Sequence, residues 1–378
     1  MTSPAPAADT LPAPVGAVAR AVQRVTAAPL GRYQSAVVRI GLSVTYLLFL
    51  LRELPHRREL YGPDGPWDWD LGHQLVASNG AFTVLLWSDS ALWFETVYAL
   101  TLVSAALLMV GWRTRATSVL FMVGVLSLQN RSIFMGDGGD NVVHLMAVYL
   151  VLTRCSRVWS LDARRATRNA ARAAEGRPPV RDVAGPVLWA VLGPVLVTAT
   201  LMGGLGGTWW LPTLLWIIWL GSAAWWAANR HAPGGEPRLL LDVLANIAHN
   251  ATLVLIMAEV CLIYSTAGWY KIQGSRWQDG TALYYPLKLD YFAPWPELSG
   301  LLASSGLIVM VLSYLTVMVQ VAFPFTLFNR RVKNVLLVVM MCEHAGIAVL
   351  LGLPFFSMAM IAADSVFLPT VFLVWLGG

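Results

Sequence analysis

The sequence predicts an all-α membrane protein, a polytopic bundle of about nine or ten transmembrane helices with a cytoplasmic N-terminus. Three observations lead to this prediction. First, 57% of the 378 residues are hydrophobic and only 12% are charged, whereas about a quarter of the residues in a soluble domain are charged. Second, apolar stretches of membrane-spanning length recur along the chain. Third, the basic residues collect on one side of the topology that these stretches define.

The apolar stretches come first, because a membrane-spanning helix needs about 20 mostly apolar residues. Candidates lie at 34–52, 91–111, 116–129, 141–154, 183–202, 209–228, 241–267, 299–328 and 335–353. The third and fourth are short. A tenth candidate, 355–377, contains Asp364 and Pro369 and is expected to bend. Within this membrane domain, 31–378, we interpret 183–228 as a helical hairpin insertion.

The basic residues indicate the orientation. With a cytoplasmic N-terminus and alternating helices, 18 of the 26 basic residues lie in cytoplasmic segments and seven in outer segments, as the positive-inside rule requires. Residues 1–30 are predicted to be a cytoplasmic tail, disordered at first and then forming a short amphipathic helix. In the loop 155–182, Arg164, Arg168 and Arg172 recur every four residues. This stripe suits an anionic leaflet, or serves only as a topology anchor.

Several function classes are excluded by the composition. The net charge is +5, but no soluble segment combines a basic block with interleaved aromatic residues, so we expect no nucleic-acid partner. The three cysteines are far apart and match neither a disulfide framework nor a zinc spacing. We therefore predict no metal, and a lipid bilayer as the surroundings of the protein.

Ionisable groups at membrane depth are candidates for function because burying them is costly. The chain offers eight: Arg39, Glu95, His144, His249, Glu259, Glu343, His344 and Asp364. Lys271 follows an apolar run, and a partly buried lysine can act as a base when it is neutral. Tyr264 lies seven residues earlier and would share its helical face. The alternatives are a snorkelling interfacial lysine and, for Glu343 and His344, a structural hydrogen bond between helices.

The segment FMGDGGDNVVHLMAVYL begins another predicted helix. Asp140 or Asn141 is expected to be its N-cap. Asp140 and His144 are four residues apart and could bind a metal together, but capping and packing are the favoured explanation. The glycines do not follow a strand, so they are not a dinucleotide-binding fingerprint.

Five segments resemble a known family. GWRTRATSVL at 111–120, NRSIFMGDGGDN at 130–141 and RVWSLDARR at 157–165 resemble the HTTM family, the transmembrane part of vitamin K-dependent gamma-carboxylases. The resemblance resumes at YSTAGWYKIQGSRWQDGTALYY and at CEHAGIAVLLGLPFFSMAMIAADSVFL, and together the segments span most of 35–368. The fourth segment is also similar to the bacterial SdpB-like branch, which helps to mature a secreted peptide toxin.

The resemblance implies an active site. Lys271 matches the family's catalytic base and His344 matches a buried family histidine, while Tyr270 replaces the first lysine of the family's pair. Gly139, Asp140 and Asn141 stand in the place of an Asn-Asn-His run, whose histidine is missing. The pocket for a quinol and a substrate would comprise Tyr270, Asn141, Asp140, Trp277 and Glu343.

The family's chemistry sets further expectations. A neutral lysine deprotonates a reduced quinone, here one resembling menaquinol, and the resulting strong base attacks a glutamate of a secreted peptide. The site would face the extracytoplasmic side of a bacterial plasma membrane. The chain ends soon after its last predicted helix, so a separate soluble companion protein would hold the peptide. The alternatives are a non-catalytic scaffold for peptide-toxin maturation or export, and a small-molecule transporter.

Overall fold

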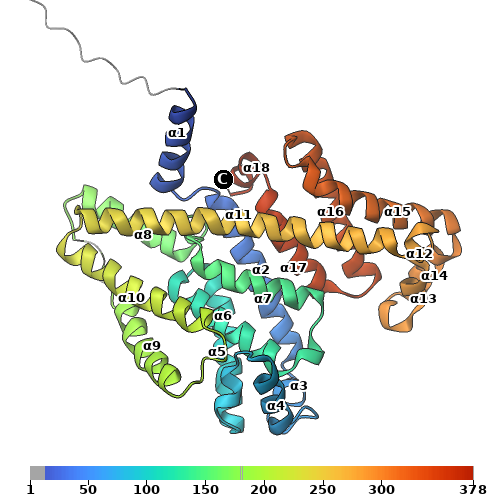
Figure 1. The fold of residues 1–378 in the computed structure, drawn as a ribbon, viewed down its shortest axis with the longest axis horizontal. Helices are drawn as coiled ribbons and strands as arrows, with labels where there is room; N and C mark the ends of the chain where they lie inside the picture. Colours follow the sequence, from blue (N-terminus) through green and yellow to red (C-terminus); the bar gives the residue numbers. More distant parts are fainter. Residues whose placement is uncertain (1–12, 179, 181, 378) are drawn as a thin grey trace, which may run out of the picture.

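The computed structural model describes residues 13–178, 180 and 182–377, and it is helical throughout, with no strand in those ranges. The predicted all-α class is thus confirmed. Figure 1 shows steep helices in the middle of the molecule, crossed by one long helix, with a hairpin on one side and a group of shorter helices on the other. The chain has 18 α-helices among the described residues, several of them a single turn or two long.

The centre of the bundle contains five helices. They are α2 (Arg32–Glu53), α5 (Ala91–Val110), α6 (Thr114–Arg131), α7 (Gly138–Leu152) and α17 (Pro354–Asp364). Small residues let their backbones approach, as is common between membrane helices. A Cβ on Gly124 would lie 2.3 Å from the Thr101 side chain, and one on Gly41 would lie 2.6 Å from Ala362. Substitution at either glycine would therefore push two helices apart.

The long helix α11 (Glu236–Gln273) has 38 residues and so measures about 57 Å. We expected a helix over 241–267, and the structure extends it at both ends. Gly235 precedes its first turn and Gly274 follows its last, and the added segments contain good helix formers such as leucine and lysine. Tyr264 and Lys271 therefore belong to one continuous helix.

The hairpin consists of α9 (Ala184–Leu201) and α10 (Trp210–His231). The indole rings of Trp189 and Trp219 stack with centroids 4.4 Å apart. Each indole nitrogen donates to the other residue's carbonyl oxygen, at 2.9 and 3.1 Å. Gly193 makes room for this pair, because a Cβ there would lie 2.7 Å from the Trp219 ring. The two helices are antiparallel and joined by an exchange of hydrogen bonds.

Shorter elements complete the fold. In the first half these are α3 (Arg57–Tyr61), α4 (Trp69–Asn79), η1 (Val84–Trp87), η2 (Ile133–Met135) and α8 (Leu161–Ala174). In the second half they are α12 (Ser275–Gln278), α13 (Tyr284–Lys288), η3 (Asp290–Phe292), α14 (Pro296–Ser304), α15 (Gly306–Ala322), η4 (Phe323–Thr326) and α16 (Arg330–Leu350). The single helix expected at 299–328 is thus divided at Ser305, whose side chain caps α15.

Seven of the described helices are long and apolar enough to cross a membrane, namely α2, α5, α9, α10, α11, α15 with η4, and α16. The bent C-terminal pair would make an eighth. This is fewer than the nine or ten expected. The difference arises at 116–129 and 141–154, where α6 has polar residues at both ends and α7 has only 15 residues. Both pack as core helices of a multi-pass bundle.

Apolar side chains on the outside of the bundle fit a lipid environment. On α9, Val187, Val191 and Val195 recur every four residues and are exposed. On α10, Ile217 and Leu220 are exposed as well. Contiguous exposed apolar surface of this kind is rare on soluble monomers, so these faces are those that a bilayer would cover.

The C-terminal segment bends as expected. After α17 the chain forms η5 (Ser365–Phe367) and then α18 (Thr370–Gly377), with an angle of 111° between the two parts. Pro369 prevents a continuous helix because it cannot donate a backbone hydrogen bond. Gln34 of α2 donates to the Leu368 carbonyl at 2.8 Å. This bond satisfies a backbone group that the break would otherwise leave unpaired.

The helix near the N-terminus ends at Ala27 and is anchored to α11. Helix α1 (Ala13–Ala27) carries Arg20 and Arg24, as the sequence suggested for 14–30. Two asparagines of α11 hold its end: Asn246 donates to the Thr26 carbonyl at 2.8 Å and Asn250 to the Val25 carbonyl at 2.8 Å. These bonds satisfy carbonyls that a helix end leaves free. The disorder expected at the start of the tail concerns 1–12, which lie outside the described residues.

Candidate functional site

Lys271 lies in the last turn of α11 and forms one bond to a neighbouring helix. Its Nζ donates to Oε1 of Gln320, at the end of α15, over 2.9 Å. The Gln320 amide in turn donates from Nε2 to Oε1 of Glu343 on α16, over 2.7 Å. Gln320 is only 5% exposed, whereas Lys271 and Glu343 are half-buried. The buried amide therefore separates an amine from a carboxylate that would otherwise attract each other.

The hydrogen bonds fix the orientation of this amide. An amide oxygen accepts and an amide nitrogen donates, so its oxygen must face the amine and its nitrogen the carboxylate. Lys271 can keep the bond to Gln320 in its neutral form as well as in its charged form, because both carry N–H donors. The arrangement thus tolerates the loss and gain of a proton at Lys271.

An aromatic ring forms another wall beside the amine. Trp277 of α12 places its ring centroid 5.3 Å from the Lys271 Nζ, within the range in which an indole face attracts a cation. The loop after it is held by Thr281, whose hydroxyl and backbone N–H donate to Asp279. These hydrogen bonds lower the pKa of Asp279. Gly280 has φ of 74° and packs against Met310 of α15, which holds the loop close to the helix.

A second group of polar side chains lies next to the first, in the core. Tyr264, on the same face of α11 as Lys271, has its hydroxyl 3.0 Å from Nε2 of His344 on α16. The same hydroxyl lies 2.9 and 3.1 Å from the two carboxylate oxygens of Asp364 on α17. His344 and Asp364 are only 3% and 0% exposed. Because Glu343 and His344 are adjacent, the two polar groups meet on α16.

Counting protons shows what the buried group can do. The hydroxyl carries one proton, so when it donates to Asp364 it accepts from Nε2–H of His344. The other ring nitrogen, Nδ1, is then an acceptor, and it has no hydrogen-bond partner among the described atoms. A proton taken up at Nδ1 can move along this chain, from Nε2 to the tyrosine oxygen and from the tyrosine to Asp364.

Two residues assigned to the pocket, Tyr270 and Asn141, have exposed side chains. Tyr270 is 74% exposed, because neighbouring residues of a helix point about 100° apart and Lys271 faces Gln320. Asn141 is also exposed, on the first turn of α7. The fold shows no contact between Lys271 and the side chain of either residue that would support their assignment to a quinol or substrate pocket.

Asp140 has a capping role. The N-cap of α7 is Asp137, which replaces the expected Asp140 or Asn141, and Asp140 completes a capping box by accepting from the Asp137 N–H at 2.8 Å. This satisfies two free amide groups of the helix end. His144 instead bonds through Nδ1 to Gln129 at 2.9 Å. Among the described residues no group of three or more potential metal-binding side chains occurs.

The start of α7 still packs close to the buried group. Phe356 of α17 has its ring centroid 5.5 Å from that of His344, and a Cβ on Gly139 would lie 2.6 Å from the Phe356 backbone. One phenylalanine thus separates the glycine-rich turn from His344. The turn at Gly138–Gly139 thus lies near the buried group, with Phe356 between them.

Other ionisable groups at depth have structural partners. The buried Arg39 guanidinium donates to the carbonyls of Leu108, Met109 and Trp159. Glu95 accepts from Arg57 at 2.8 Å at one end of the bundle. The carbonyls offset the cost of burying the Arg39 charge, and Glu95 is a half-buried member of an ion pair.

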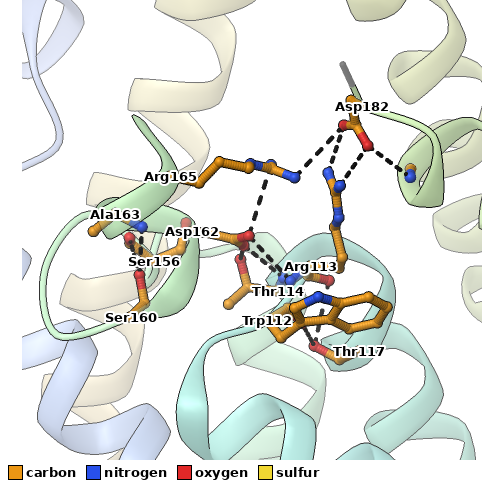
Figure 2. Close-up of polar contacts among 11 residues, drawn as sticks. Trp112, Arg113, Thr114, Thr117, Ser156, Ser160, Asp162, Ala163, Arg165 and Asp182 are labelled. Carbon is orange, nitrogen blue, oxygen red and sulfur yellow. Dashed lines mark hydrogen bonds and ion pairs between the residues drawn. The ribbon is translucent and has the colours of Figure 1, made fainter. Parts of the chain in front are cut away.

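The segments 111–120 and 157–165 meet in a structural joint. Figure 2 shows the Asp162 carboxylate accepting from the N–H groups of Arg113 and Thr114, at 3.1 and 2.9 Å, and from the Thr114 hydroxyl at 3.0 Å. Arg165 and Asp182 add ion pairs to this joint. Asp162 thus caps α6 from the start of α8, and the two segments hold each other in place.

Gln320 was not among the site residues predicted from the sequence. It is the single amide in the apolar run GLIVMVLSYLTVMVQVAF, and that isolation was the available signal. Comparisons with protein-family models, with curated proteins and with solved structures found no match for this chain.

Proposed function

We propose that this protein is a multi-pass membrane enzyme in which Lys271 is the base. The observation that carries the proposal is the setting of its amine, held by Gln320 beside the Trp277 ring and separated from Glu343. Such a lysine is ready to take up a proton, since the resulting ammonium would gain the indole face, the amide oxygen and the nearby carboxylate.

We also propose which membrane contains the protein and on which side of it Lys271 lies. The protein would lie in a bacterial plasma membrane with its N-terminus in the cytoplasm and Lys271 toward the extracytoplasmic side. The charge bias of the loops supports this orientation. Arg238 and Lys271 lie 33 residues apart on α11, about 50 Å along the helix, which exceeds a hydrocarbon thickness of about 30 Å. The two ends of α11 can therefore reach opposite interfaces.

A reduced quinone fits the donor set at Lys271. Lys271, Gln320, Glu343 and Trp277 are the residues that would hold it. When bound, a menaquinol-like molecule would supply an acidic hydroxyl and reducing electrons. The task of Lys271 is to accept the hydroxyl proton, and that of Gln320 is to hold the amine in position while its charge changes.

The substrate in this proposal is a glutamate-containing secreted peptide, and a soluble companion protein would present it. The support is the resemblance to the HTTM family, including its SdpB-like branch, together with exposed aromatic residues in the segment 269–295, which contains Lys271 and Trp277. Trp269, Tyr270, Tyr291 and Trp295 are all more than half exposed. Aromatic residues of this kind favour both membrane interfaces and protein contacts.

The test is the mass of the peptides that the native host secretes. Lys271→Met should abolish a mass increase that the wild-type strain produces, since methionine cannot accept a proton. Lys288→Met, at an exposed lysine in the segment after α12, is the matched control and should leave the modified peptide unchanged. A gain equal to CO₂ on a glutamate would identify a carboxylase. Modified peptide in the Lys271→Met strain at the wild-type level would refute the proposal.

A second candidate function is a non-catalytic scaffold for peptide-toxin maturation or export. The same exposed aromatic residues favour it, because a partner-binding surface needs large rigid side chains. A scaffold would tolerate Lys271→Met and would lose export or cleavage of the peptide when Trp269 or Tyr291 is replaced by alanine. The peptide mass would then be the same in all strains that export it.

A further inference from the structure

At the other end of α11, far from Lys271, arginines gather around one tryptophan. The guanidinium carbons of Arg238 and Arg115 lie 4.2 and 4.3 Å from the Trp225 ring centroid, and that of Arg154 lies 5.4 Å away. We call Trp225, Arg115, Arg154, Arg157, Arg238 and Asp242 the Trp225 cluster. Its members come from α6, α10, α11 and the segment between α7 and α8.

The positive charges of the Trp225 cluster outnumber its negative charges. Asp242 is its single carboxylate, and it pairs with Arg154 at 2.9 Å and with Arg238. Asn246 accepts a further bond from Arg154 at 2.6 Å, and Asn229 one from Arg238 at 2.6 Å. Arg115 and Arg157 form no ion pair with any described carboxylate, and both are exposed. Four guanidinium groups thus share one carboxylate, which leaves an excess of three positive charges.

These charges affect one another. Partial burial of the guanidinium, and then the charge of Arg154, lower the pKa of Arg157, and the charges of Arg238 and Arg32 add to this effect. Like charges held together in this way are unfavourable unless an anion joins them. The cluster therefore has the electrostatics of an anion site with two free guanidinium groups.

The cluster also lies where lipid headgroups would be. Arg115 is in the first turn of α6, Arg154 follows the end of α7, and Arg238 is in the first turn of α11. Figure 1 shows α8, the end of α10 and the start of α11 together on one side of the molecule. Helix ends of a membrane bundle lie near the interface, and tryptophan is enriched there.

We propose that the Trp225 cluster binds the phosphate of an anionic phospholipid headgroup, with Arg115 as its main ligand and Arg157 as a further positive charge nearby. A guanidinium group can form two parallel hydrogen bonds to phosphate oxygens. Basic pockets between membrane helices are suited to anionic lipids on the cytoplasmic side. The acyl chains would then extend along the apolar outer face of α10, where Ile217 and Leu220 are exposed.

Native mass spectrometry of the purified full-length protein tests this site. The protein is loaded with equal amounts of phosphatidylglycerol and phosphatidylcholine, and the lipids that stay bound are counted. The wild type should retain phosphatidylglycerol. Arg115→Gln with Arg157→Gln should lower its retention at least tenfold, and Arg157→Gln alone should lower it in part. The single variant keeps the Arg115 stack on Trp225, so a folding defect of the double variant cannot hide the result.

The matched control removes two arginines that are exposed on α8. Arg164→Gln with Arg168→Gln changes the net charge equally but leaves the Trp225 cluster intact, so its lipid retention should equal that of the wild type. Equal loss in both double variants would mean general surface attraction and would overturn the proposal, as would a wild type that retains no phosphatidylglycerol. Displacement of the lipid by millimolar inorganic phosphate would identify free phosphate as the ligand and overturn the lipid assignment.

Discussion

Gln320 is the residue on which the arrangement at Lys271 depends. Gln320→Leu keeps a side chain of similar length but removes both hydrogen bonds. Hydrogen bonds to charged groups contribute about 1.5–3 kcal/mol, so peptide modification should fall roughly tenfold to a hundredfold. The measurement is the ratio of modified to unmodified peptide at equal protein level. Gln129→Leu is the matched control, since this half-buried amide bonds His144 and the Asp140 carbonyl away from Lys271, and it should leave the ratio unchanged.

Tyr264 should matter for stability. Tyr264→Phe removes the hydroxyl that His344 and Asp364 share and leaves two buried polar groups without that partner. Each unpaired buried group costs about 1–3 kcal/mol, so the thermal midpoint in detergent should fall by several degrees. Tyr314→Phe removes an exposed hydroxyl that bonds the Gln278 carbonyl at 2.9 Å and should have little effect. Equal midpoints for the two variants would contradict a structural role of the buried group.

The sequence allowed part of the site to be predicted, and the reasons are local. Lys271, Glu343 and His344 were singled out because ionisable groups are rare in apolar runs, and the seven-residue spacing related Tyr264 to Lys271. Gln320 is uncharged, and its two bonds join helices far apart in sequence. Tyr270 was included because it stands in the place of the first lysine of the family's pair, and its side chain is exposed because adjacent side chains of a helix point in different directions.

The joint between α6 and α8 decides how one end of the bundle is assembled. Asp162→Ala should lower the free energy of unfolding by about 1–2 kcal/mol, because the carboxylate caps α6 and no other side chain there replaces it. Thermal unfolding in detergent measures the change. Asp89→Ala, at an exposed aspartate just before α5, is the control and should unfold as the wild type does. A change of the same size at Asp89 would show that the effect is not one of capping.

The length and polarity of individual helices explain why fewer of them span the membrane than the sequence predicted. Apolar runs predicted α2, α5, α9, α10 and α16 because each run coincides with one helix. The helix α6 has polar residues at both ends and α7 has only 15 residues, and both sit in the core, where burial by other helices replaces contact with lipid. The division of 299–328 at Ser305 was hard to predict because serine is also common inside membrane helices. Here its side chain caps α15.

The orientation of the whole molecule is a prediction from loop charges, and labelling can test it. In a Cys261→Ser and Cys342→Ser background, Tyr291→Cys in the segment before α14 should react with a membrane-impermeant maleimide on intact cells. Ala170→Cys on α8 should react only after the membrane is opened. Both positions are exposed, so access depends on the side of the membrane. Labelling of Ala170→Cys alone on intact cells would invert the topology and move Lys271 to the cytoplasmic side.

A base at residue 271 must be able to lose its proton. Lys271→Arg tests this most directly, because arginine keeps a donor for Gln320 and a cation for Trp277 but stays protonated. The measurement is the mass of the secreted peptide in a strain that carries this variant at the wild-type protein level. We predict that the peptide is exported without modification. Modified peptide at the wild-type level would show that the residue acts only through its charge, and the role of Lys271 as a base would have to be abandoned.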